Sequence, residues 1–137
     1  MIRLTPVDVV ALAPASPLIT DDEAAVSFRA AVRLFSRWGL TDEQAALLLD
    51  IGLRSYRRWK MEGPGRLGRD GKARLSNLMG IHKGLRLIFG DSPRVYAWIK
   101  APNAAFGGQS ALDVMLQGEL TDLIRVRRYI DAERGGW

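Results

Sequence analysis

The stretch "LTDEQAALLLDIGLRSYRRWK", residues 40–60, constrains the fold of this chain more than any other. Thr41 and Gln44 match the Ser/Thr-x-x-Glu/Gln capping box, so a short helix begins here. It ends at the break Asp50-Ile51-Gly52, and a second short helix is expected from Leu53 to Met61. A connection this short does not permit an antiparallel hairpin, so the two helices must cross steeply. That arrangement is a helix-turn-helix.

The chain concentrates its positive charge on this second helix and the residues after it. From Ile51 to Arg74 there are eight basic residues and only two acidic ones, while the whole chain of 137 residues has a formal net charge of +5. The rest of the chain is therefore close to neutral. A compact basic block on a balanced protein is typical of phosphate-backbone binding. A merely solvated basic face is the alternative that the charge pattern leaves open.

The helix-turn-helix gives this block a specific interpretation. In such a unit the second helix lies in the major groove of DNA, with its N-terminal residues at base edges. The candidate groove residues are Arg54, Ser55, Arg57 and Arg58. Lys60 and the arginines of the following loop are expected at phosphates. Arginine suits guanine edges because its planar guanidinium donates two parallel hydrogen bonds, worth about 1–3 kcal/mol of discrimination per pair.

Two aromatic residues, Tyr56 and Trp59, lie three positions apart on the second helix. This spacing puts both on one face, where they either stack on bases or pack against the first helix of the unit. Aromatic residues at helical spacing are usually part of a core, so we expect packing. In the turn between the helices, Asp50 tolerates the left-handed backbone conformation better than most residues.

The remaining start and stop signals are also helical, and we expect an all-α fold. Thr20 and Glu23 form a capping box for a first helix that Gly39 ends. No segment alternates with period two, as a half-buried strand would. The longest helix is expected from Asp70 to Phe89, and its apolar stripe comprises Leu75, Leu78, His82, Leu85 and Phe89.

Gly80 and Gly84 are four residues apart on this long helix, where a missing side chain allows a neighbouring element to approach closely. After it, Ser92-Pro93 begins a short helix and Ser110 caps another. The last helix is expected from about Glu119 to Arg134, and its buried residues are Leu120, Leu123, Ile124 and Ile130.

The chain offers no catalytic or metal-binding constellation, so we expect neither an enzyme nor a cofactor. It has no cysteine and one histidine, His82, which no acidic residue accompanies at a metal-ligand spacing. We expect His82 to be packed, with one hydrogen bond. Most carboxylates open helices, where they stabilise the helix dipole. Gly107-Gly108 lacks the wider glycine spacing and the Lys-Ser/Thr of a phosphate-binding loop.

The stretch "KAPNAAFGGQSALD", residues 100–113, has no ionisable residue between its two ends, although 26% of the chain is charged. A neutral surface can be desolvated against a partner without stranding a charge. Trp98 and Phe106 are residue types that anchor interfaces. A structural role is the alternative: Asn103 would cap backbone groups, and Gly107-Gly108 would supply conformations that a side chain forbids.

The segments "LMGIHKGLRLIFGD", "AWIKAPNAAFGGQSALDVML" and "LTDLIRVRRYIDAERGGW" resemble the Xre/MbcA/ParS family of antitoxins, especially those paired with RES-domain toxins. The resemblance covers roughly residues 40–137. It implies an N-terminal helix-turn-helix that binds the operon's own promoter and a C-terminal region that binds a toxin. RES toxins resemble ADP-ribosyltransferases and consume NAD, and the antitoxin would inhibit by covering the approach to their active site.

The resemblance also implies which residues bind the toxin. The family's central motif falls on Trp98, Asn103, Phe106, Gly107 and Gly108, and its ending falls on Arg127, Arg128, Tyr129 and Trp137. The arginines would suit a toxin pocket built for the phosphates of NAD, because guanidinium groups pair with phosphate. A solvated face of the last helix is the alternative role for them. The family's tendency to dimerise implies a homodimer within a larger toxin-antitoxin complex.

We therefore expect three parts: an extended arm over residues 1–19, a helix-turn-helix DNA-binding region over 20–69, and a helical dimerisation and toxin-binding region over 70–137. The arm has no apolar run long enough to span a bilayer, so no membrane association and a cytoplasmic location are expected. The expected function is an antitoxin that occludes a RES-domain toxin and represses its own operon at operator DNA. The alternatives are a stand-alone helix-turn-helix transcriptional regulator without a toxin, and an inhibitor whose helix-turn-helix is vestigial.

Overall fold

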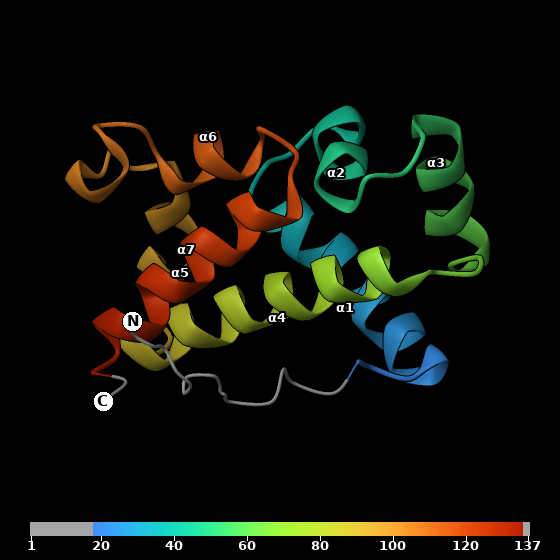
Figure 1. Cartoon of the computed structure of the whole chain (residues 1–137), viewed down its shortest axis with the longest axis horizontal. Coiled ribbons are helices and arrows are strands. Elements are labelled where there is room, and N and C mark those ends of the chain that lie inside the picture. Colours follow the sequence, from blue (N-terminus) through green and yellow to red (C-terminus); the bar gives the residue numbers. More distant parts are fainter. Residues whose placement is uncertain (1–17, 136–137) are drawn as a thin grey trace, which may run out of the picture.

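The computed structural model describes residues 18–135, and this part of the chain is helical with one isolated β-bridge and no strand (Figure 1). The all-α prediction is confirmed. The arm before residue 18 lies outside the described residues, as does Trp137. The helices are α1 (Asp21–Arg37), α2 (Asp42–Leu49), α3 (Leu53–Glu62), α4 (Arg69–Phe89), α5 (Arg94–Ala97), α6 (Ala111–Met115) and α7 (Leu120–Glu133), with the 3-10 helices η2 (Trp98–Lys100) and η3 (Ala104–Phe106).

Short-range capping decides where the helices begin. The Thr20 hydroxyl accepts a hydrogen bond from the Glu23 backbone N–H at 3.1 Å, and the Glu23 carboxylate accepts one from the Thr20 N–H at 2.8 Å. Thr41 and Gln44 make the same reciprocal pair at the start of α2. Each box satisfies donors that the first turn of a helix leaves without partners, so both predicted starts are confirmed.

The break between α2 and α3 is a tight turn, which confirms the predicted helix-turn-helix. Asp50 has φ 53° and ψ 48°, the left-handed conformation, and its N–H donates to the Leu47 carbonyl at 3.1 Å. Aspartate tolerates this conformation because its short side chain can hydrogen-bond locally. Gly52 then adopts an extended conformation as the N-cap of α3, without a side-chain cap.

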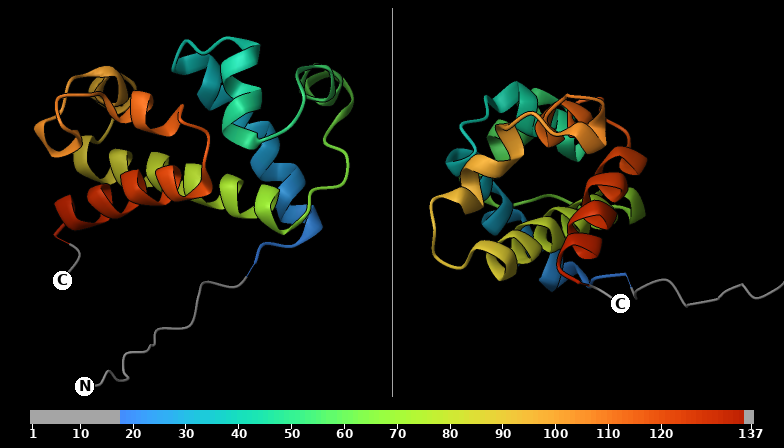
Figure 2. Two further views of the ribbon diagram at one scale, coloured as in Figure 1. Left: turned by 45° about the horizontal axis from the view of Figure 1, so that its top comes forward. Right: turned by 90° about the vertical axis from the view of Figure 1, so that its left-hand side faces the viewer.

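Helix α4 is the centre of the molecule, with α1 crossing it on one side and α7 alongside it (Figures 1 and 2). Leu75, Leu78, Ile81 and Leu85 of α4 are fully buried. Burying each such side chain contributes about 1.5–3 kcal/mol. The predicted stripe was wrong at His82 and at Phe89, which are only partly buried, and Ile81 takes a core position that was not predicted.

In α7 the core positions are Leu123, Val126 and Ile130. The predictions for Leu123 and Ile130 are confirmed, whereas Leu120 and Ile124 are only partly buried. The buried face of α7 is therefore rotated from the expected one. An added Cβ at Gly84 would lie 2.5 Å from Ile130 Cγ2, so the predicted close approach at this glycine is confirmed.

The same close approach occurs at Gly80, where the guanidinium of Arg127 occupies the space that a Cβ would need. Two glycines one turn apart thus let α7 lie directly against the α4 backbone. Across residues 18–135, no helix combines the length and the apolar character that a bilayer span requires.

Candidate functional site

The basic residues of α3 are arranged around an aromatic anchor. Tyr56 is buried, and its ring lies 6.0 Å from that of Phe28 in α1 in an edge-on arrangement. The Trp59 ring lies 5.9 Å from the same phenylalanine. Both aromatic residues therefore pack against α1, which confirms the packing interpretation. The opposite face of α3 presents Arg54, Arg57 and Arg58 to solvent, with Ser55 half-buried and Lys60 exposed.

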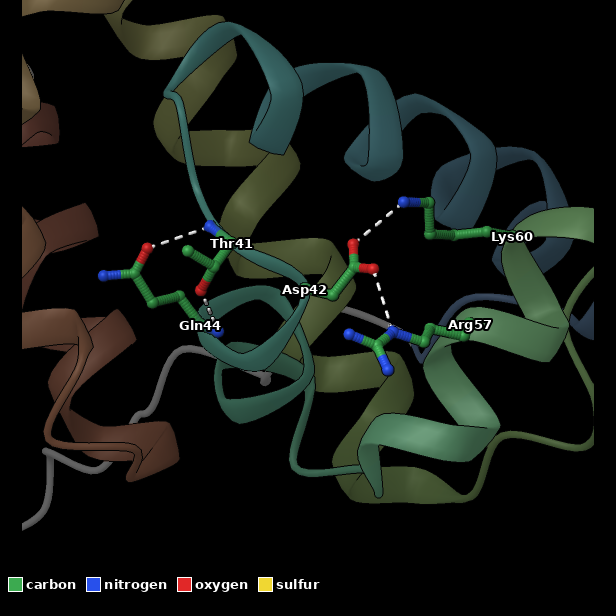
Figure 3. A network of polar contacts seen from close by, with 5 residues as sticks. All are labelled: Thr41, Asp42, Gln44, Arg57 and Lys60. Atoms are coloured by element: carbon green, nitrogen blue, oxygen red, sulfur yellow. Dashed lines mark hydrogen bonds and ion pairs between the residues drawn. The ribbon is translucent and has the colours of Figure 1, made fainter.

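Two of these basic side chains are already engaged inside the protein. The Asp42 carboxylate, on the first residue of α2, accepts from Arg57 Nε at 3.2 Å and from Lys60 Nζ at 2.9 Å (Figure 3). Hydrogen bonds from Lys60 and then Arg57 hold the pKa of Asp42 below its usual range, so this carboxylate stays ionised at neutral pH. Within residues 18–135, Arg54 and Arg58 make no ion pair.

The basic block beyond α3 is smaller than its sequence suggests. Arg74 is only 4% exposed; its Nε donates to Asp70 at 2.7 Å and its Nη1 donates to the Leu48 carbonyl at 3.2 Å. Lys72 pairs with Asp21 at 2.7 Å. Arg74 and Lys72 therefore connect α4 to α2 and α1, and the interpretation of the whole block as a phosphate-binding surface was wrong for these two residues.

The neutral stretch after α5 forms a compact loop that Asn103 organises. Its Oδ1 accepts from the Ala105 N–H at 2.9 Å, and its backbone N–H donates to the Gln109 carbonyl at 3.0 Å. Gly107 and Gly108 have φ 67° and φ 90°, values that side chains other than glycine rarely adopt. The structural roles proposed for these three residues are confirmed.

Beneath this loop lies an aromatic cluster of Trp98, Phe106 and Tyr129. The Trp98 and Tyr129 rings are nearly parallel with centroids 6.1 Å apart, and the Phe106 ring meets Tyr129 edge-on at 5.2 Å. Phe106 is buried, whereas Trp98 and Tyr129 are half-buried. The structure thus brings together candidates from η2, η3 and α7. Phe106 is the buried member of the cluster, and Trp98 and Tyr129 are partly buried and pack against the core.

The arginines near the end of α7 differ in their surroundings. Arg127 Nη1 donates to the Ser76 carbonyl of α4 at 3.4 Å, and its guanidinium covers Gly80. This arginine therefore contributes to the packing of α7 against α4. Arg128 is exposed and makes no ion pair within the described part of the chain. The candidate Trp137 lies outside the described residues.

The hydrogen bond expected of His82 is not found within residues 18–135. Its Nδ1 is buried without a partner among the described residues, and its ring stacks on Tyr96 with centroids 5.7 Å apart. Burial, with a smaller contribution from the Arg86 charge, lowers the pKa of His82. A neutral imidazole stacked on a tyrosine is a packing element of the α4–α5 contact.

Comparison with known proteins assigns the N-terminal and C-terminal regions of the chain to described protein families. Residues 17–80 match the family described as "Antitoxin Xre-like helix-turn-helix domain", and residues 84–136 match the "Antitoxin Xre/MbcA/ParS C-terminal toxin-binding domain". The chain belongs to the Xre/MbcA/ParS antitoxin family. The "Uncharacterized protein y4oB" of Sinorhizobium fredii is 42% identical to this antitoxin over 121 residues, which is 88% of this chain and 94% of that protein.

The antitoxin also has the fold of a solved relative. It superimposes with a TM-score of 0.54 and 22% identity on a chain of the "Crystal structure of the M. tuberculosis MbcT-MbcA toxin-antitoxin complex", covering 81% of this chain and 96% of that one. The α3 face lies in the helix-turn-helix match and the neutral loop in the toxin-binding match. These two sites lie at opposite ends of the molecule (Figure 1).

Two residues of the antitoxin's candidate sites were missed by sequence reasoning. Asp42 is one of the carboxylates that open helices and were assigned only to the helix dipole, although it binds two cations of α3. Arg125 lies over the Phe106 ring, 5.2 Å from its centroid, and was not singled out. Its position four residues before Tyr129 on α7 was the available signal, because such neighbours share a helix face.

Titration of Tyr56 tests the anchor beneath α3. Burial, helped by the Asp42 charge, raises the pKa of Tyr56 to about 12 from its ordinary value of 10.0. The folded state therefore retains the phenol proton where the unfolded state loses it, so this contribution to stability is complete below pH 10 and is lost as the pH rises to 12. We expect urea unfolding between pH 8 and 11 to show a smaller alkaline loss of stability for Tyr56→Phe than for the wild type.

Proposed function

We propose that this antitoxin binds and occludes an NAD-degrading RES-domain toxin and represses its own operon through the helix-turn-helix. The match of residues 84–136 to a toxin-binding domain carries the proposal. The RES type of the toxin rests on the resemblance of the second half of the sequence to antitoxins paired with RES toxins. The action is binding alone, in the cytoplasm, without a catalytic residue or a cofactor.

The neutral loop and the aromatic cluster are the proposed toxin-binding surface. The loop over residues 101–112 has no charged side chain, so covering it with a toxin strands no charge. Trp98 and Tyr129 offer half-buried aromatic surface beside it, which is the composition of an interface core. Arg128 and Arg125, both exposed on α7, are the cations proposed to contact the toxin beside this surface.

The exposed face of α3 is the proposed DNA-binding surface. Arg54 and Arg58 make no ion pair within residues 18–135, so both are available for base edges or phosphates. Arg57 and Lys60 approach DNA from the positions in which Asp42 holds them. A homodimer inside the toxin-antitoxin complex would place two such helices on one operator.

Two full-length variants, one in the neutral loop and one in α3, separate toxin binding from DNA binding. Ala105→Glu places a charge at the exposed tip of the neutral loop, and we expect it to abolish rescue of toxin-expressing cells while DNA binding persists. Ser36→Glu adds the same charge at an exposed position of α1 and serves as the control. The readouts are growth, cellular NAD, and co-purification with the product of the adjacent gene. Normal rescue by Ala105→Glu would exclude the loop from the interface.

The reciprocal variant is Arg54→Gln combined with Arg58→Gln. We expect its affinity for the DNA upstream of the operon to fall roughly ten- to hundredfold, because each lost contact costs on the order of 1 kcal/mol. Rescue should be unaffected. A chain that binds this DNA but forms no complex with the adjacent gene product would instead be a stand-alone transcriptional regulator.

A further inference from the structure

We propose that Asp42 is a specificity-determining residue of the DNA-binding face, because it restrains Arg57 and Lys60 and weakens their binding to phosphates in non-specific registers. The inference rests on the proposed function, since it concerns the same face of α3. It assigns a role to an acidic side chain within an otherwise basic DNA-binding surface.

The geometry ties all three side chains together. Asp42 Oδ2 accepts from Arg57 Nε and Asp42 Oδ1 accepts from Lys60 Nζ, so both carboxylate oxygens are occupied (Figure 3). Arg57 and Lys60 come from successive turns of α3, and Asp42 comes from the first turn of α2. A single carboxylate therefore holds two cations of the recognition helix against the preceding helix.

Both cations keep donors for a phosphate in this arrangement. Arg57 uses its Nε alone, which leaves the two terminal nitrogens of its guanidinium, and the Lys60 ammonium has two further N–H groups. Half of the Arg57 side chain is exposed, with a relative accessibility of 57%. The cluster thus presents oriented donors, but it carries one net positive charge where the two basic residues alone would carry two.

This reduced charge acts on non-specific binding in particular. Non-specific affinity comes from counterion release by cations that adapt to any phosphate register, and each neutralised phosphate adds about 0.9 to the salt slope. Cations held by Asp42 cannot adapt freely. In the matching register the held geometry is preorganised, so less ordering is needed on binding. Removing the carboxylate should strengthen non-specific binding more than specific binding.

The contacts of Asp42 are too exposed to act mainly through stability. All three side chains are at least 30% exposed, and exposed ion pairs contribute little to folding. The start of α2 is secured independently by Thr41 and Gln44. Asp42→Asn keeps the shape of the side chain and removes its charge, so we expect this variant to unfold at nearly the same urea concentration as the wild type.

The test compares binding of full-length wild type and Asp42→Asn to two duplexes, the DNA upstream of the operon and a scrambled duplex of the same composition, over a series of salt concentrations. We expect Asp42→Asn to bind the scrambled duplex roughly five- to tenfold more tightly, with a salt slope steeper by about 0.9. The ratio between the two affinities should fall.

Glu43→Gln is the matched control, because Glu43 is the next residue of α2, is exposed, and makes no ion pair within residues 18–135. A second control introduces Asp42→Asn into a chain that already carries Arg57→Gln and Lys60→Gln, where its effect should be no larger than that of Glu43→Gln.

An unchanged affinity ratio, or an effect equal to that of Glu43→Gln, overturns the inference and leaves DNA binding intact. Failure of the wild type and of Asp42→Asn to bind either duplex overturns the DNA-binding part of the proposed function, and the inference falls with it.

Discussion

Arg74→Ala is expected to lower the free energy of unfolding by about 3 kcal/mol. The Arg74 guanidinium is buried between α4 and the end of α2, where Nη1 donates to the Leu48 carbonyl at 3.2 Å. That carbonyl is one of the groups that a helix end leaves without an intrahelical partner. Alanine would leave it unsatisfied and create a cavity, whereas Asp70 is half exposed and would be rehydrated.

The measurement is urea denaturation followed by circular dichroism. Arg69→Ala serves as the control, because this substitution removes the same charge from the same helix. Arg69 is exposed and makes no ion pair within the described residues. A loss below about 1 kcal/mol for Arg74→Ala would contradict the structural role, because values of that size are typical of exposed ion pairs.

This prediction also affects how the proposed DNA-binding surface should be tested. Arg74 lies in the basic block of the sequence, so in an alanine scan of the proposed surface its substitution would destabilise the fold as well as remove a positive charge. Arg54 and Arg58 carry the same charge, are exposed and make no ion pair within residues 18–135. Substitutions at these exposed residues separate a loss of contact from a loss of structure.

Gly84→Ala is expected to lower the free energy of unfolding by about 2 kcal/mol. The new Cβ would lie 2.5 Å from the Ile130 Cγ2 methyl, and Ile130 is 1% exposed, so its branched side chain has no space to move into. Alanine has a better helix propensity than glycine by about 1 kcal/mol, and the clash must exceed this gain. The helices α4 and α7 would have to separate.

Gly80→Ala is the matched substitution one turn earlier on the same helix. Its Cβ would meet the guanidinium of Arg127, the far end of a flexible side chain that is partly exposed. Arg127 can move aside, so the gain in helix propensity should offset most of the cost. The expected change is within about 1 kcal/mol. Equal losses for the two glycines, measured by urea denaturation, would contradict the packing of α7 described above.

Because α4 is shared, the two regions of this antitoxin do not form separate bodies. Its Leu75, Leu78 and Ile81 belong to one continuous core that includes Phe28 and Phe35 of α1. A C-terminal fragment that begins at Leu75 would lack α1 and would expose these apolar side chains of α4 to water. Full-length variants with surface substitutions therefore separate toxin binding from DNA binding more cleanly than truncations do.

The helix starts and the left-handed turn were predictable because the interactions that cause them span three or four residues. Thr20 with Glu23, Thr41 with Gln44 and Ser110 with Asp113 are local pairs, and all three capping boxes are present. The same holds for the loop that Asn103 and two glycines shape. Such patterns can be read from a sequence, because neighbouring residues are close in space whatever the fold.

Which charged residues remain available for a partner depended on contacts between distant parts of the chain. Asp42 meets Arg57 and Lys60 across 15 and 18 residues, Arg74 meets the Leu48 carbonyl across 26, and Arg127 meets the Ser76 carbonyl across 51. A sequence shows the charge of each of these side chains. Only the packing of α2, α3, α4 and α7 decides which charges are neutralised inside the fold, because electrostatic pairing depends on distance in space and burial.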